Sequence, residues 1–122
     1  MELHESGEMY LETILTLKKK KGSVRSIDVA NALDYSKPSV SRGMKLLKES
    51  NLITIDSKGF IDFTKEGQMI AEKVFELHTT LTQFFTYIGV SVKQAEEDAC
   101  RVEHIISDET YQCIRSFMQK QS

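Results

Sequence analysis

The fold that we predict is decided by one stretch, Ser36–Ser50, which reads SKPSVSRGMKLLKES. Ser36 can cap a helix, and Pro38 falls in its first turn, where a missing N–H costs nothing. The inward positions of this helix are apolar: Val40, Met44 and Leu47. Its opposite face combines cations with hydroxyl groups and is formed by Pro38, Ser41, Arg42, Lys45 and Glu49. A short helix with a basic outer face is suited to lie against DNA.

The segments on either side of this helix favour the same interpretation. A shorter helix over residues 27–33, which Ser26 can cap, comes before it and is joined to it by a turn at residues 34–36. Two β-rich runs, 52–55 and 60–63, follow it and are separated by a tight turn. A hairpin directly after a helix-turn-helix is a wing. With an amphipathic first helix from about Gly7 to Lys21, residues 1–64 are predicted to form a winged helix-turn-helix DNA-binding domain.

The outward side chains of the second helix and of the wing are the DNA contacts that we expect. Arg42 can form a bidentate contact with guanine, or a phosphate contact without base readout. Lys58, at the wing tip, is placed for a phosphate, although a solvated turn lysine is an equal alternative. Lys18 to Lys21 either complement the helix dipole or contact phosphate. The full set of expected DNA contacts is Ser36, Lys37, Pro38, Ser39, Ser41, Arg42, Lys45 and Lys58.

Residues 65–122 are predicted to form a helical domain that binds metal and dimerises. A long helix from Thr64 to about Tyr87 repeats apolar residues at steps of four and three: Ile70, Val74, Leu77, Leu81, Phe84 and Ile88. Such an apolar helix is expected to pack on a partner subunit as well as on its own chain. Two shorter helices, starting at Ser91 and Ser107, complete a mainly α fold.

Charge and composition restrict the classes of function. Residues 18–65 contain 11 lysines and arginines against 5 aspartates and glutamates, whereas the rest of the chain contains 5 against 13. A basic lobe beside an acidic lobe is typical of a DNA reader joined to a cation-binding module. The apolar runs are too short to span a membrane, and no signal peptide is recognised, so we expect a cytoplasmic protein. No catalytic motif is present; a small metal-dependent hydrolase is a remote alternative, and no small-molecule substrate is expected.

A cluster of metal-ligand residue types lies near the C-terminus. Read as one helix, residues 96–107 place Cys100, Glu103, His104 and Ser107 on one face. A thiol, a carboxylate and an imidazole together are ligands for a divalent transition metal. Candidates by type to complete the site are His78, Met9 and Glu12. Each also has an alternative role: Met9 and Cys100 as core residues, His78 as a buried histidine, and Glu103 with His104 as a solvated pair.

The chain resembles the metal-dependent repressors typified by the diphtheria toxin repressor and the manganese transport regulator. The matching segments are residues 9–14, 36–41 and 52–64, with Gly67, His78, residues 98–104 and residues 107–109. The resemblance implies a homodimer that binds palindromic operators in double-stranded DNA when metal is bound. It assigns Met9, Cys100, Glu103 and His104 to the primary metal site of the iron-responsive branch. His78 matches a histidine of both branches, and Glu12 a ligand of the manganese branch.

Departures from the family pattern affect the second metal site and the operator. Thr82 and Glu96 stand where the iron branch has a second-site glutamate and a histidine, and Arg42 stands where its prototype has glutamine. The SH3-like third domain of that branch is expected to be missing. Soft sulfur ligands favour Fe2+, with Co2+, Ni2+ or Mn2+ possible. We therefore expect an Fe(II)-dependent repressor in which metal ties the first helix to the dimer core; the alternative is a metal-independent winged-helix transcription factor.

Overall fold

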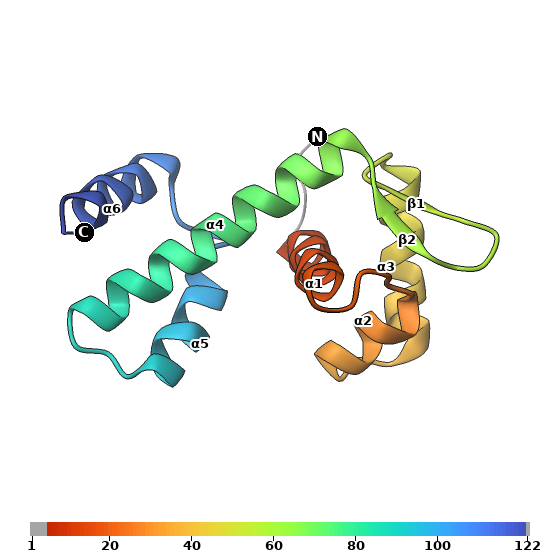
Figure 1. Ribbon diagram of the computed structural model, residues 1–122, viewed down its shortest axis with the longest axis horizontal. Coiled ribbons are helices and arrows are strands. Elements are labelled where there is room, and N and C mark those ends of the chain that lie inside the picture. The colour runs from red at the N-terminus through yellow and green to blue at the C-terminus, as the bar shows by residue number, and fades with distance from the viewer. Residues whose placement is uncertain (1–4, 122) are drawn as a thin grey trace. The chain divides into compact units, whose positions relative to one another are not determined.

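The computed structural model describes residues 5–121, which form six helices and one two-stranded antiparallel sheet (Figure 1). In chain order the elements are α1 Glu5–Lys21, α2 Ser26–Leu33, α3 Lys37–Glu49, β1 Ile53–Ile55, β2 Ile61–Phe63, α4 Lys65–Tyr87, α5 Val92–Val102 and α6 Asp108–Lys120. The mainly helical fold with a winged helix-turn-helix confirms the predicted class. Two compact units divide the chain, Met1–Glu72 and Lys73–Ser122, and each is described by itself.

The N-terminal unit is a three-helix core in which α1 packs on the helix-turn-helix formed by α2 and α3 (Figure 1). Its fully buried side chains come from all three helices and the hairpin: Leu11, Ile14, Val29, Val40, Met44, Leu52 and Ile61. Asp34 makes the turn with a left-handed φ of 57°. Ser36 then caps α3 by accepting a hydrogen bond from the Ser39 N–H at 3.3 Å, as predicted.

The cap of α2 differs from our expectation. The helix begins at Ser26, so Arg25 rather than Ser26 is the cap residue. The Arg25 N–H donates to Asp28 Oδ2 at 2.9 Å, and Lys21 lies 2.7 Å from the other oxygen of the same carboxylate. The carboxylate of Asp28, in the first turn, therefore caps the start of α2 in place of the Ser26 hydroxyl. It also joins the end of α1 to the start of α2.

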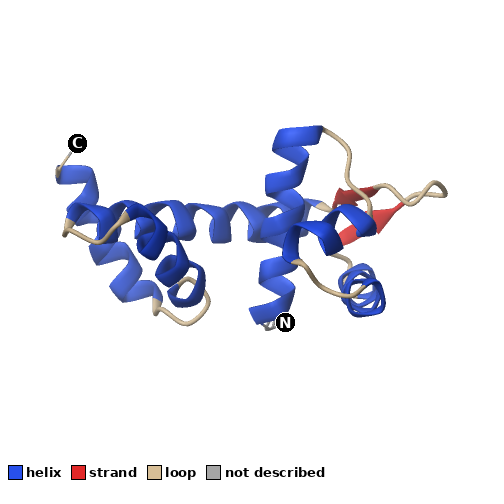
Figure 2. Ribbon diagram, turned by 90° about the horizontal axis from the view of Figure 1, so that it is seen from below, coloured by secondary structure: helices blue, strands red, loops and turns tan. Residues whose placement is uncertain are grey.

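The wing is the hairpin of β1 and β2, drawn in red in Figure 2, where it extends beyond the helices of its unit. Ile53 pairs with Phe63 and Ile55 with Ile61. The hairpin is also tied back to the segment before α2, since Ile61 donates to the Val24 carbonyl at 2.8 Å. The Arg25 guanidinium lies 4.4 Å from the centroid of the Phe60 ring. These contacts fix the base of the wing and leave its tip exposed.

The helix α4 starts in the N-terminal unit and continues into the C-terminal unit. Thr64 accepts from the Gly67 N–H at 3.1 Å and donates to the Asn51 carbonyl at 2.9 Å. A side chain at Gly67 would lie 1.8 Å from the Leu52 carbonyl oxygen, so this position requires glycine. The hairpin and α4 therefore meet at direct backbone contact. Over residues 5–121, no helix has both the length and the apolar character that crossing a membrane requires.

In the C-terminal unit, α6 is held to α4 by polar and aromatic contacts. Tyr111 donates to Glu76 Oε1 at 3.2 Å, and Arg115 Nε lies 3.1 Å from the same oxygen. Phe117 meets the rings of Phe84 and Tyr87 edge-on, at 6.0 and 5.8 Å between centroids. Of the predicted apolar seam, Val74, Leu77 and Leu81 are buried, whereas Ile88 is exposed.

The predicted single helix over residues 96–107 is wrong. The helix α5 ends at Val102, whose carbonyl accepts from both Ile105 and Ile106 at 3.0 and 2.9 Å. Ser107 does not share a face with Cys100, because it caps the next helix by accepting from Thr110 at 3.2 Å. The competing cap at Ser107 ends the helix early, and Glu103 and His104 lie in the turn that follows it.

Candidate metal centre and nucleic-acid surface

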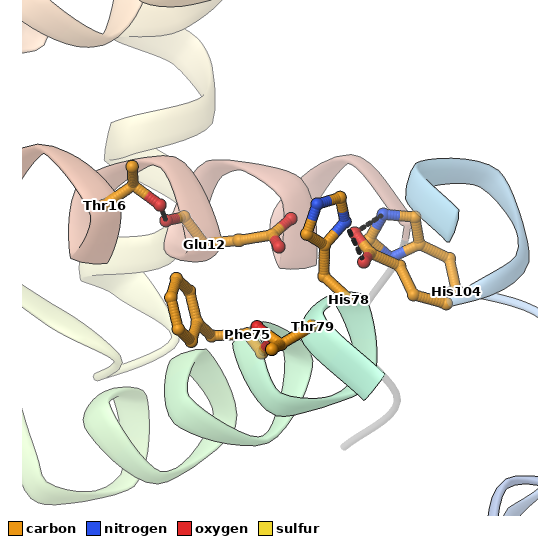
Figure 3. Close-up of polar contacts among 7 residues, drawn as sticks. Glu12, Thr16, Phe75, His78, Thr79 and His104 are labelled. Atoms are coloured by element: carbon orange, nitrogen blue, oxygen red, sulfur yellow. Dashed lines mark hydrogen bonds and ion pairs between the residues drawn. The ribbon is translucent and has the colours of Figure 1, made fainter. Parts of the chain in front are cut away.

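The carboxylate of Glu103 is the centre of the candidate metal site. It is the buried charged residue of the described chain, and its side chain has no exposed area. His78 Nδ1 lies 3.0 Å from Oε2, and His104 Nε2 lies 3.3 Å from Oε1. In Figure 3, where His78 and His104 are labelled, dashed lines mark these two contacts. Residues from α4 and from the turn after α5 thus converge on one buried anion.

Cys100 belongs to the same cluster. One ligand atom each from His78, Cys100 and Glu103 lies within 4.8 Å of the others. Cys100 is an exposed residue of α5, three residues before Glu103. A cation between these atoms would have a nitrogen, a sulfur and an oxygen donor, the mixture that divalent transition metals accept.

The contacts of Glu103 show that the cluster fits a cation. Its Oε1 is buried and accepts no hydrogen bond from the described residues, although His104 lies beside it. Leaving a buried acceptor unsatisfied costs about 1–3 kcal/mol, and more when the group is charged. A divalent cation would satisfy such an oxygen directly. The alternative role of Glu103 and His104 as a solvated pair is wrong, since their side chains are 0% and 2% exposed.

Met9 and Glu12, the two other predicted ligands, lie on α1 in the N-terminal unit. Both are half-buried. The Met9 sulfur accepts a hydrogen bond from the Tyr35 hydroxyl at 3.7 Å. The structure therefore gathers His78, Cys100, Glu103 and His104 in one unit and places Met9 and Glu12 in the other.

The predicted DNA contacts lie together on the outer surface of α3. Ser36, Lys37, Pro38, Ser41, Arg42 and Lys45 are exposed, and Ser39 is half-buried. Arg42 Nη2 donates to Ser39 Oγ at 3.3 Å, and the Ser36 hydroxyl donates to the same oxygen at 2.8 Å. The Ser39 hydroxyl therefore holds the guanidinium in place on the outward face.

The wing presents Lys58 at its tip. Asp56 Oδ1 accepts from the N–H of Lys58 and from that of Phe60, both at 2.9 Å, and Gly59 adopts a φ of +87°. The turn is therefore rigid at its base, while the Lys58 side chain is exposed. This geometry is compatible with the predicted phosphate contact and equally with the solvated alternative.

The lysines at the end of α1 have partners that sequence reasoning missed. Lys18 lies 3.1 Å from Asp62 on β2, and Lys21 lies 2.7 Å from Asp28 on α2. The hydrogen bonds from these lysines hold the pKa of Asp62 and that of Asp28 below the ordinary value of 3.8. Two of the four lysines therefore attach the wing and the helix-turn-helix to α1. No spacing rule predicts such pairs, because their partners are set by tertiary packing.

Comparisons with known proteins give a consistent result. Residues 2–60 match the family model described as "Iron dependent repressor, N-terminal DNA binding domain", and residues 64–121 match "Iron dependent repressor, metal binding and dimerisation domain". The transcriptional regulator MntR of Escherichia coli O6:H1 is 34% identical over 91% of this chain and 72% of its own length. The diphtheria toxin repressor of Corynebacterium diphtheriae is 29% identical over 88% of this chain and 48% of its own.

Among solved structures, that of the manganese regulator SloR superimposes with a TM-score of 0.81 and 24% identity. The match covers 93% of this chain and 53% of SloR, so the chain spans about half the length of this relative and of the diphtheria toxin repressor. One matched model is described as the DNA-binding domain of a repressor and MntR is named a transcriptional regulator, so the family is one of DNA-binding repressors and not of enzymes, as expected. The chain belongs to the family of metal-dependent transcriptional repressors typified by the diphtheria toxin repressor and MntR.

Proposed function

We propose that the chain is an Fe(II)-dependent repressor that binds a palindromic operator as a homodimer. The observation that carries the proposal is the buried Glu103 carboxylate, flanked by the imidazoles of His78 and His104. Removing a carboxylate from water without a full set of partners is costly. Such an anion is therefore best understood as a ligand whose cation completes the site.

The donor types favour iron over manganese. Hard cations such as Mn2+ prefer carboxylate, carbonyl and water oxygens, whereas a thiolate favours softer cations. Cys100 contributes sulfur within the cluster, and Met9, on α1, is the second sulfur donor that we propose. Glu12 is the proposed oxygen donor from the same helix. Because the affinity order alone would favour copper and zinc, supply in the cell must also select, and Co2+, Ni2+ or Mn2+ could occupy the same ligands.

The names of the relatives leave the choice of metal open. SloR is named a manganese regulator, whereas both matched family models are described as iron dependent. The sulfur of Cys100 is the feature of this chain that decides our proposal. Should Mn2+ bind as tightly as Fe2+, the preference for iron would be wrong although metal-dependent repression would stand.

We propose residues 1–64 as the DNA-binding domain and residues 65–122 as the metal-binding and dimerisation domain. Ser36, Lys37, Pro38, Ser39, Ser41, Arg42, Lys45 and Lys58 are the proposed DNA contacts. Arg42 is the proposed guanine reader, because its guanidinium is exposed and oriented by Ser39. A bidentate contact of this kind contributes about 1–3 kcal/mol of discrimination between bases.

The proposed homodimer is supported by apolar side chains that the C-terminal unit leaves exposed. Ile88, Val92 and Ile105 are 59%, 59% and 76% exposed. Large exposed apolar residues are typical of interfaces. A twofold dimer presents two copies of α3, and two such helices read half-sites about 34 Å apart or a multiple of that distance. A palindromic operator follows from this symmetry.

The test is operator binding with and without Fe(II) under anaerobic conditions, on sites selected from random DNA. Wild type, Cys100→Ala and Cys113→Ala are compared; Cys113 is the chain's other cysteine and is exposed on α6. We expect wild type and Cys113→Ala to bind tightly only with metal, and Cys100→Ala to lose the response. Equal binding by all three without metal would identify the alternative, a metal-independent winged-helix transcription factor.

A further inference from the structure

A tyrosine at the helix-turn-helix holds one of the proposed metal ligands. The Tyr35 hydroxyl donates to the Met9 sulfur at 3.7 Å, which joins positions 26 residues apart within the N-terminal unit. Tyr35 lies in the turn between α2 and α3, and its N–H donates to the Ala30 carbonyl at 3.1 Å. Because the backbone of this turn is anchored, the hydrogen bond of the Tyr35 hydroxyl links the position of the Met9 sulfur to the position of the turn.

Tyr35 directly precedes Ser36, the cap residue of α3. The segment that follows it is therefore the start of the proposed recognition helix, where Ser36 orders Ser39 and Ser39 orders Arg42. A displacement at Tyr35 would be passed to these groups through one peptide unit. The link between Met9 and the DNA-facing surface is short and contained in one compact unit.

A second contact runs parallel to the first. Tyr10, next to Met9 on α1, meets the Tyr35 ring edge-on with centroids 6.3 Å apart. The Tyr10 ring also lies against α3, since a side chain at Gly43 would approach its Cε2 to 2.4 Å. The Met9–Tyr10 pair thus contacts both the turn and the proposed recognition helix. A displacement of Met9 would therefore be transmitted to α3 through direct side-chain contacts.

We propose that Tyr35 is a positioning residue that couples ligation at Met9 to the helix-turn-helix. This inference rests on the proposed function, in which Met9 is a metal ligand. In the structure the Tyr35 O–H donates to a lone pair of the Met9 sulfur. If that sulfur were a ligand, its electron density would be reduced and the hydrogen bond would weaken. The Tyr35 hydroxyl, which lies beside the start of α3, could then donate to a DNA phosphate.

Metal ligation at Met9 and the Tyr35–Met9 hydrogen bond must affect each other equally, and this determines whether removing the hydroxyl raises or lowers metal affinity. If ligation at Met9 weakens the Tyr35 hydrogen bond, the hydrogen bond must weaken ligation by the same factor. Removing the hydroxyl should therefore raise metal affinity. A hydrogen bond of this strength corresponds to a change of about twofold to fivefold. The same variant should lower the DNA affinity of the metal-loaded protein, because it lacks the donor for the phosphate.

The experiment compares wild type, Tyr35→Phe, Met9→Leu and the double variant in the full chain. Tyr87→Phe is the matched control, since its hydroxyl bonds to Gln121 at 2.9 Å in the other unit. Co(II) affinity is measured by anaerobic titration. The methyl resonances of 13C-labelled methionines are recorded without metal, and the Met9 signal is assigned by its loss in Met9→Leu. DNA affinity is measured with saturating Co(II).

We expect Tyr35→Phe to shift the Met9 methyl resonance, to raise Co(II) affinity about threefold and to have no effect on Co(II) affinity in the Met9→Leu background. Tyr87→Phe should change none of these. The coupling is overturned alone if Met9→Leu weakens Co(II) binding while Tyr35→Phe changes neither the affinity nor the resonance. If Met9→Leu binds Co(II) as wild type does, Met9 is not a ligand, and both this inference and that part of the proposed function are wrong.

Discussion

Replacing Glu103 by glutamine should stabilise the metal-free protein while abolishing its response to metal. Glu103→Gln keeps the shape of the side chain and removes the buried negative charge. The unsatisfied Oε1 costs about 1–3 kcal/mol in the wild type, and more if charged. The hydrogen bond of Oε2 to His78 at 3.0 Å offsets part of this cost, and an amide can still contact both imidazoles.

The net expected gain in the free energy of unfolding without metal is about 1–2 kcal/mol, because the substitution removes the charge from a buried side chain whose Oε1 lacks a hydrogen-bond donor within the described part of the chain. For a chain of this size that corresponds to about 4–8 °C in Tm. With metal bound, wild type should be more stable than Glu103→Gln. Loss of a charged ligand should weaken binding at least about 100-fold, more than the loss of an outer partner of a ligand usually does. A 100-fold weaker Kd removes about 2.7 kcal/mol of ligand-induced stabilisation.

The assay is thermal unfolding followed by circular dichroism, with chelator and with Co(II) under anaerobic conditions. Glu97→Gln, an exposed carboxylate on the same α5 helix, is the control and should behave as wild type in both conditions. A Glu103→Gln protein that melts below wild type in chelator would refute the reasoning. Glu103 would then be a structural partner of the two histidines and not an anion retained for a cation.

Three further outcomes are expected. Gly67→Ala should destabilise the chain by about 3 kcal/mol or more in denaturant unfolding, because its new side chain would meet the Leu52 carbonyl; a smaller loss would show that this backbone contact can relax. Lys58→Ala should reduce the salt dependence of operator binding by about one unit of slope if the lysine contacts phosphate, and an unchanged slope would identify a solvated turn residue. Because Lys21 lowers the folded-state pKa of Asp28, their pair stabilises the fold above pH 3.8, and this stabilisation is lost as pH falls through the folded-state pKa. Asp28→Asn should therefore flatten that part of the acid unfolding profile measured by fluorescence.

Local sequence signals predicted most of the helix starts and the wing. The serines at positions 36, 91 and 107 cap helices as their type and spacing indicated. The two β-rich runs pair in the register that a tight turn between them imposes. These features depend on interactions within a few residues, which a local pattern contains. The exceptions were helix ends at which two nearby residues could both form the cap or the boundary. At α2 the Asp28 carboxylate caps the helix instead of Ser26, and α5 ends at Val102 because Ser107 caps the next helix.

The sequence by itself determined which chemical groups the candidate site could use and which helix face could meet DNA. Only the tertiary structure decided that Glu103 is buried between two imidazoles, that Lys18 and Lys21 are occupied by Asp62 and Asp28, and that Tyr35 holds Met9. The physical reason is the separation along the chain of the residues that interact. Ligand type, capping and periodicity are properties of neighbouring residues, whereas burial and pairing are properties of segments that meet only when the chain has folded.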